Sequence, residues 1–110
     1  MFAVIFEVEP TVEGRQEYLD RAAALRPELE KIDGFISIER FASLTQEDKI
    51  LSLSIWRDEQ AVQAWREHSQ HREAQDAGRH KLFKNYRIRV AEIARDYGPE
   101  DRDQAPESAG

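Results

Sequence analysis

The stretch from Trp56 to Arg79 holds most of the side chains in this sequence that could do chemistry. Its indole, imidazole and guanidinium groups belong to Trp56, Trp65, His68, His71, Arg72 and Arg79. His68 and His71 fall on one face of a helix, where two imidazoles could meet one metal ion or line one pocket. Glu67 precedes His68 instead of lying between the histidines, so the HExxH pattern is absent, and no third ligand is evident. We therefore predict no metal site.

His71 is the residue for which we predict a role in a functional pocket. An imidazole titrates near neutral pH, so it can accept or donate a proton, or ligate haem iron. Arg72 and Arg79 are candidates for holding a carboxylate, since a guanidinium donates paired hydrogen bonds to such a group. The alternative is a structural His71 that caps a helix or satisfies a buried hydrogen bond. If His71 acts on a ligand, its replacement should impair ligand chemistry and leave stability unchanged.

Glu7 and the two tryptophans are further candidates. Trp56 and Trp65 could form walls of a binding site, although buried tryptophans also dominate small cores. Glu7 points from the first expected strand toward its less apolar face. If that face lines a cavity, burial would raise the pKa of the Glu7 carboxyl and make it a candidate general base; otherwise Glu7 is a solvated residue at the rim.

Four strands and two helical regions must position these side chains. Residues 2–9 alternate, with Phe2, Val4, Phe6 and Val8 on one face, and residues 35–41, 49–56 and 83–96 also have strand character. The first helical region follows a cap at Thr11, is broken or restarted at Pro27, and ends at Gly34. The second begins after a cap at Asp58 and is closed or interrupted at Gly78.

The resulting order, β-α-β-β-α-β, predicts an α+β fold of the ferredoxin-like type. This fold has a four-stranded antiparallel sheet with two helices on one face. The opposite face needs a cover, because several strand residues are too apolar to face water. They include Ile36, Ile38, Leu51, Leu53 and Ile55. A second copy of the sheet would bury them, so we predict a homodimer.

Composition restricts the function further. The chain has 110 residues, a net charge of −6 and no cysteine, which excludes thiolate nucleophiles, disulfides and iron–sulfur clusters. The longest apolar run, residues 2–6, is far below the about 20 residues of a membrane span, and no signal peptide precedes it, so we expect a cytoplasmic protein without membrane contact. Net acidity argues against nucleic-acid binding. We divide the chain into a domain over 1–97 and an acidic tail over 98–110 that is disordered, or ordered only on a partner subunit.

The sequence resembles the antibiotic biosynthesis monooxygenase family over residues 2–97. The resemblance is carried by FISIERF at 35–41, SIW at 54–56, AW at 64–65, HREAQ at 71–75, GR at 78–79, YRIRV at 86–90 and RDY at 95–97. It implies a homodimer whose sheets face each other as an α+β barrel. It also implies one cavity per protomer, between sheet and helices, that holds a small aromatic ligand.

The resemblance further implies a monooxygenase that oxidises an aromatic or quinone-like molecule with O₂ and needs no metal or flavin. The residues that would serve it are His71 as proton acceptor or donor, Arg72 or Arg79 as anion holder, Trp65, Tyr86 and Trp56 as walls, and Glu7 as a possible second base.

Two alternatives remain open. Haem-degrading members of the family use a first-strand Asn, a Trp on the second helix and a His that ligates iron. Trp65 and His71 match the last two in kind, but Glu7 stands at the position that would correspond to the Asn, and the chain's one Asn is Asn85. The other alternative is a ligand-binding dimer without catalysis, since one fold hosts many functions.

Overall fold

Six elements form the body of the protein. The structure is a computed structural model that describes residues 1–75 and 82–106, with side chains for all of these except 70–75. The elements are β1 (Phe2–Pro10), α1 (Arg15–Glu30), β2 (Phe35–Ala42), β3 (Ile50–Trp56), α2 (Glu59–Gln75) and β4 (Phe83–Glu92). The β-α-β-β-α-β order predicted from the sequence is confirmed.

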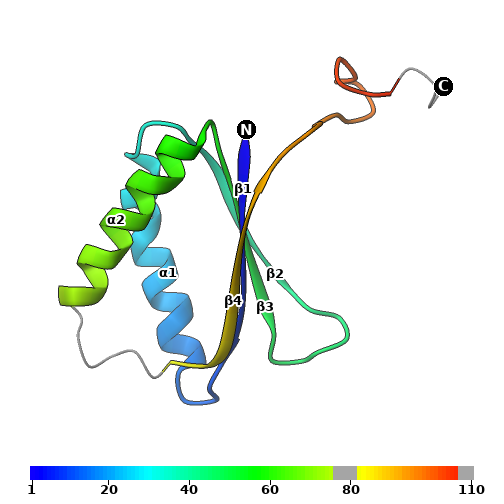
Figure 1. The fold of residues 1–110 in the computed structure, drawn as a ribbon. Helices are drawn as coiled ribbons and strands as arrows, with labels where there is room; N and C mark the ends of the chain where they lie inside the picture. The colour runs from blue at the N-terminus through cyan, green and yellow to red at the C-terminus, as the bar shows by residue number, and fades with distance from the viewer. Residues whose placement is uncertain (76–81, 107–110) are drawn as a thin grey trace.

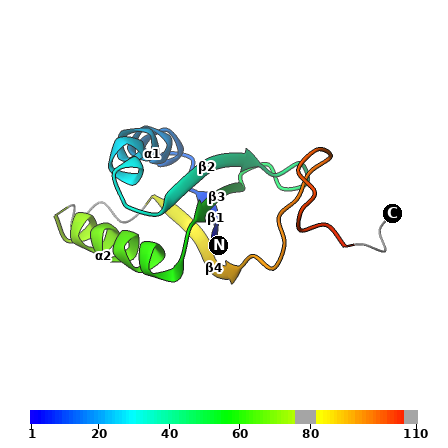
Figure 2. The ribbon, with the colours of Figure 1, turned by 90° about the horizontal axis from the view of Figure 1, so that it is seen from above.

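The four strands form one antiparallel sheet in the order β2-β3-β1-β4. Both helices lie against the same face of this sheet (Figures 1 and 2). The ferredoxin-like architecture is therefore confirmed, with one face covered by helices and one face bare.

The core lies between the sheet and the helices. Trp56 and Val8 point from the sheet into it and are fully buried, and they meet Leu29 and Tyr18 of α1 and Val62 of α2. The predicted face of β1 with Phe2, Val4, Phe6 and Val8 is the helix side, because all four belong to these two clusters. Strict alternation along β1 thus assigns its other residues to the bare face.

The bare face has an apolar centre. Leu51, Leu53 and Ile55 of β3 are partly exposed there, alternating with the buried Ser52 and Ser54 that face the helices. The expectation that Ile38 also lies on this face is wrong. An irregularity between Phe35 and Ser37 shifts the register of β2, which pairs Ile38 with Ser54 and packs it in the core, while Ile36 stays half-exposed.

Three element boundaries differ from the sequence-based expectation. Helix α1 begins at Arg15, and the Thr11 hydroxyl accepts a hydrogen bond from Gly14 N–H at 2.9 Å in the turn before it. The helix continues through Pro27, because the loss of one backbone bond is offset by the packing of its buried face on the sheet. Strand β4 ends at Glu92, since β1 begins at Phe2 and only the Ile93 N–H to Met1 carbonyl bond lies beyond it.

The predicted Asp58 cap is confirmed by its hydrogen bond from Ala61 N–H.

In the described part of the chain, no helix combines the length and the apolar character that crossing a membrane requires.

The C-terminal tail leaves the body beyond β4 (Figure 1). Its hydrogen bonds are local, from Gly98 N–H to the Asp101 carbonyl at 2.8 Å and from Asp96 N–H to Gln104 Oε1 at 2.8 Å. Residues 99–104 are exposed. The described tail therefore buries little against its own chain.

Deleting residues 98–110 is expected to change the melting temperature by less than about 2 °C, because a segment that buries little contributes little to stability. Thermal unfolding of the full and shortened chains, followed by circular dichroism, checks this. A loss of several degrees would mean that the tail docks on the body or on a second subunit.

Candidate functional site

A pair of stacked tryptophans joins α2 to the sheet on the helix side. The rings of Trp56 and Trp65 are 6.3 Å apart between centroids with an interplanar angle of 24°. Trp56 is fully buried, and its indole N–H donates to Ser54 Oγ at 2.9 Å. Trp65 is only partly buried. Trp56 therefore has no surface to offer a ligand and instead supports Trp65, which does.

A second aromatic group lies on the same side of the sheet, over β1 and β4. The Phe6 ring is 6.0 Å from the rings of both Phe83 and Tyr86, and Phe83 and Tyr86 are 6.2 Å apart. Tyr18 of α1 meets Phe83 edge to face at 5.4 Å. Four aromatic rings from α1, β1 and β4 thus form one continuous cluster.

The helix side of β4 is apolar but exposed. Its residues Tyr86, Ile88 and Val90 are 60%, 55% and 48% exposed, although they pair with the helix-side residues of β1. Helix α1 packs mainly on β2 and meets β4 at Phe83, and α2 packs on β1 and β3, so the described part of the chain leaves these three residues about half exposed or more. We call Tyr86, Ile88 and Val90 the β4 strip. An apolar strip beside an aromatic cluster can accept the face of a flat ring.

Tyr18 is a residue of this region to which sequence reasoning assigned only a place in the core. It is 7% exposed, as the helix pattern predicted, but its buried hydroxyl has no hydrogen-bond partner among the residues that the structure describes. Periodicity can reveal that a residue is buried. It cannot reveal an unpaired hydroxyl, which depends on neighbours distant in sequence.

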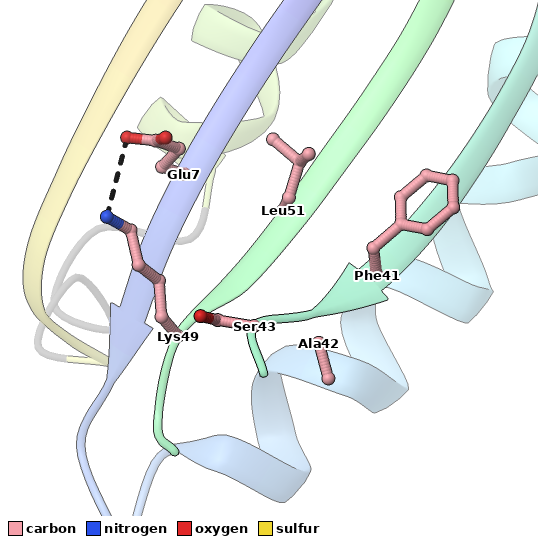
Figure 3. A pocket seen from close by; sticks show the side chains of 6 residues that line it. All are labelled: Glu7, Phe41, Ala42, Ser43, Lys49 and Leu51. Atoms are coloured by element: carbon pink, nitrogen blue, oxygen red, sulfur yellow. Dashed lines mark ion pairs between the residues drawn. The ribbon is translucent and has the colours of Figure 1, made fainter. Parts of the chain in front are cut away.

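Glu7 lies on the opposite, bare face. Its Oε2 accepts a hydrogen bond from Arg89 Nη1 at 3.1 Å and is 3.7 Å from Lys49 Nζ, the ion pair drawn in Figure 3. The Arg89 hydrogen bond, followed by the charges of Lys49 and Arg89, outweighs desolvation and lowers the pKa of Glu7. The rise expected for a cavity-facing base is therefore wrong for this chain, and Glu7 does not share a face with Trp65.

A pocket of about 230 Å³ opens beside Glu7 on the bare face (Figure 3). It is lined by Glu7, Phe41, Ala42, Ser43, Lys49 and Leu51. It lies at the turn that joins β2 to β3, on the face that a second sheet would cover, and none of the helix-side aromatic residues lines it.

His68 forms a link between the helices. Its Nε2 lies 2.8 Å from Glu28 Oε1 of α1, and its ring is 5.6 Å from that of Trp65. The other predicted members of this segment are only partly placed. His71 and Arg72 belong to α2, but their side chains, like the whole of Arg79, lie outside the described residues.

The described residues contain no group of three or more potential metal-binding His, Cys, Asp or Glu side chains. His71 and His80 fall outside that search.

Comparison with known proteins decides the family. Residues 1–77 match the family model described as antibiotic biosynthesis monooxygenase. The chain belongs to the antibiotic biosynthesis monooxygenase family. Within this family it is 46% identical over 93 residues to jasmonate monooxygenase ABM from Pyricularia oryzae, a match that covers 84% of the chain and 43% of that protein. It is also 32% identical over 63 residues to protein YqjZ of Bacillus subtilis, covering 56% of the chain and 53% of YqjZ. The chain thus spans about half the length of these curated relatives.

Solved structures share the fold. A crystal structure from Deinococcus radiodurans that is assigned to the antibiotic biosynthesis monooxygenases superposes with a TM-score of 0.74 at 15% identity, over 89% of this chain and 97% of that one. The haem degrader MhuD of Mycobacterium tuberculosis, with two haems bound in its active site, superposes with a TM-score of 0.68 at 20% identity, over 89% and 100%. These likenesses support the fold described above for this chain.

Proposed function

We propose that this antibiotic biosynthesis monooxygenase family member oxidises an aromatic or quinone-like small molecule with O₂, and that the molecule binds on the helix side of the sheet. The observation that carries the proposal is the combination of a partly exposed Trp65, backed by buried Trp56, with the exposed β4 strip on the same side of the sheet. These surfaces provide aromatic and apolar contacts from two different elements.

The proposed reaction begins with removal of a proton from the substrate. The resulting electron-rich anion reduces O₂ directly, so that one oxygen atom enters the substrate and the other leaves as water when a ring methylene becomes a carbonyl. Because the substrate anion supplies the electrons, this chemistry requires no metal or flavin. We assign the proton transfer to His71, which follows Trp65 along α2, and the holding of the anion to Arg72 or Arg79. Glu7 has no part in this step, because it lies on the other face.

We also propose that the protein is a homodimer in which two bare faces meet. The partly exposed Leu51, Leu53 and Ile55 support this arrangement, because a chain of this size has few other ways to cover them. The pocket beside Glu7 would then lie within the interface between the two sheets.

Replacing His71 by Ala is expected to lower the rate of O₂ uptake about 100-fold, as for the loss of a general base, and to change the melting temperature by less than about 2 °C. An oxygen electrode with anthrone, whose ring methylene can become a carbonyl, measures the rate. His80→Ala is the matched control and should keep full activity. A His71→Ala protein that loses stability but keeps its turnover would assign His71 a structural role. His68 is unsuitable as a control, since it contacts both Glu28 and Trp65.

The relative named for jasmonate suggests a second substrate class for the same assay. Jasmonate is a small carboxylate, and Arg72 and Arg79 are the candidate carboxylate holders. Jasmonic acid therefore belongs in the panel beside anthrone. Binding of either compound without O₂ uptake would favour the non-catalytic alternative.

Haem binding is the second candidate function, favoured by the fold shared with MhuD. Glu7 stands at the position that would correspond to the Asn of haem-degrading members, and it points to the bare face. The helix side of β1 carries apolar residues such as Phe6 and offers no amide side chain. The described residues therefore fit haem degradation poorly. A haem titration followed by absorbance distinguishes this candidate from cofactor-free oxidation.

A further inference from the structure

We propose that the hydroxyl of Tyr18 hydrogen-bonds an oxygen atom of the bound molecule, and so selects oxygen-substituted fused-ring aromatics over plain hydrocarbons. This inference rests on the proposed helix-side aromatic site and names a residue and a ligand group for it. Tyr18 would be a binding residue contributed by α1, in addition to Trp65 of α2 and Tyr86 of β4.

The first reason is energetic. Tyr18 is 7% exposed and its hydroxyl has no partner in the described structure. A buried hydroxyl without a hydrogen bond is destabilising, because it loses its bonds to water and gains none in return. Phe would place the same ring in the same position without this cost. A buried polar group without a partner therefore calls for an explanation, and an oxygen atom of a bound molecule would supply the missing bond.

The second reason is location. The Tyr18 ring packs against Phe83, and Phe83 contacts both Phe6 and Tyr86, so the ring belongs to the aromatic cluster that continues into the β4 strip. Among the described side chains, the other buried polar atom without a partner is Nε of Arg40 on β2. In the sheet β2 is separated from β4 by β3 and β1, so Arg40 lies at the far edge. Of these two groups, Tyr18 is therefore the one near the β4 edge of the sheet, where the exposed aromatic residues lie.

The chemistry of the hydroxyl defines the ligand class. A tyrosine hydroxyl can donate to a carbonyl or phenolate oxygen and accept from a phenol. The partly buried side chains that pack against the cluster of Tyr18, Val8 and Ile50 are apolar and favour a flat, uncharged ring system; they are Phe6, Leu19, Leu82 and Phe83. The matching ligand is a fused-ring aromatic with a hydroxyl or keto oxygen at one edge.

Two probes of nearly the same shape test this, 1-naphthol and naphthalene. The wild-type protein and the Tyr18→Phe variant are titrated with each probe, and binding is followed by equilibrium dialysis. We expect the wild type to bind 1-naphthol about tenfold more tightly than naphthalene after correction for their water solubilities, and Tyr18→Phe to lose this preference. The melting temperature of Tyr18→Phe should be unchanged or higher. Tyr97→Phe makes the same change at an exposed position beyond β4 and should behave as wild type.

The outcomes separate the inference from the function on which it rests. If the wild type binds neither probe, the proposed aromatic site is wrong. If it binds both and Tyr18→Phe keeps the full preference for 1-naphthol, the aromatic site stands and the role of Tyr18 is overturned. A Tyr18→Phe variant that melts several degrees lower would also overturn that role, because its hydroxyl would then have a structural partner.

Discussion

Replacing Trp56 by Ala is expected to lower the free energy of unfolding by about 3–5 kcal/mol, as for other large-to-small changes of buried aromatic residues. Trp56 has no exposed surface. Its ring packs against those of Phe35 and Trp65, with centroid separations of 5.4 and 6.3 Å. Its removal leaves a cavity between β3 and α2 and also leaves the hydroxyl of Ser54 without its donor. Because small domains are stable by only about 5–15 kcal/mol, this change alone should bring the protein close to unfolding at 37 °C.

Urea unfolding followed by circular dichroism measures this effect. Leu44→Ala is the control, because Leu44 is fully exposed in the turn between β2 and β3 and its shortening leaves no cavity. It should change the free energy of unfolding by less than about 0.5 kcal/mol. Equal losses in the two variants would show that Trp56 is not a central core residue. Trp56→Ala should also impair probe binding, since Trp65 loses the ring behind it.

Replacing Leu53 by Glu is expected to weaken self-association at least about 100-fold while the chain stays folded. Leu53 lies in the middle of the bare face, paired with Ile5 of β1 and Glu39 of β2. A carboxylate there is solvated in a single chain, but it would be buried without a partner between two sheets, at a cost of several kcal/mol.

Sedimentation equilibrium at micromolar concentration tests the dimer and the variant together. The wild type should give twice the chain mass of 12.8 kDa, and Leu53→Glu should give the single mass. Val12→Glu places the same charge at a position that is 83% exposed, off the bare face, and should remain dimeric. A monomeric wild type, or a dimeric Leu53→Glu, would contradict the face-to-face arrangement.

The order and type of the elements could be predicted from the sequence, because alternation and helical periodicity are local properties of the chain. Phe2, Val4, Phe6 and Val8 alternate with less apolar residues, and all four lie on the helix side. The same reasoning failed at Ile38, where one extra residue in β2 moves the side chain to the other face. A register shift arises from pairing with β3, so the sequence of β2 alone does not reveal it.

For the candidate site, the sequence determined which chemical groups are present and the tertiary structure decided which of them share a surface. Trp65 and Tyr86 were predicted as site walls, and they do lie on one side of the sheet. Glu7 was grouped with them, yet the side-chain direction at its position places it on the other face. There its carboxylate forms ion pairs with Arg89 and Lys49. The hydrogen bond between His68 and Glu28 joins two helices that are far apart in sequence. The hydroxyl of Tyr18 is left without a described partner by the way that α1 packs on the sheet. Such features depend on how helices and strands pack in three dimensions, and local patterns carry no information about them.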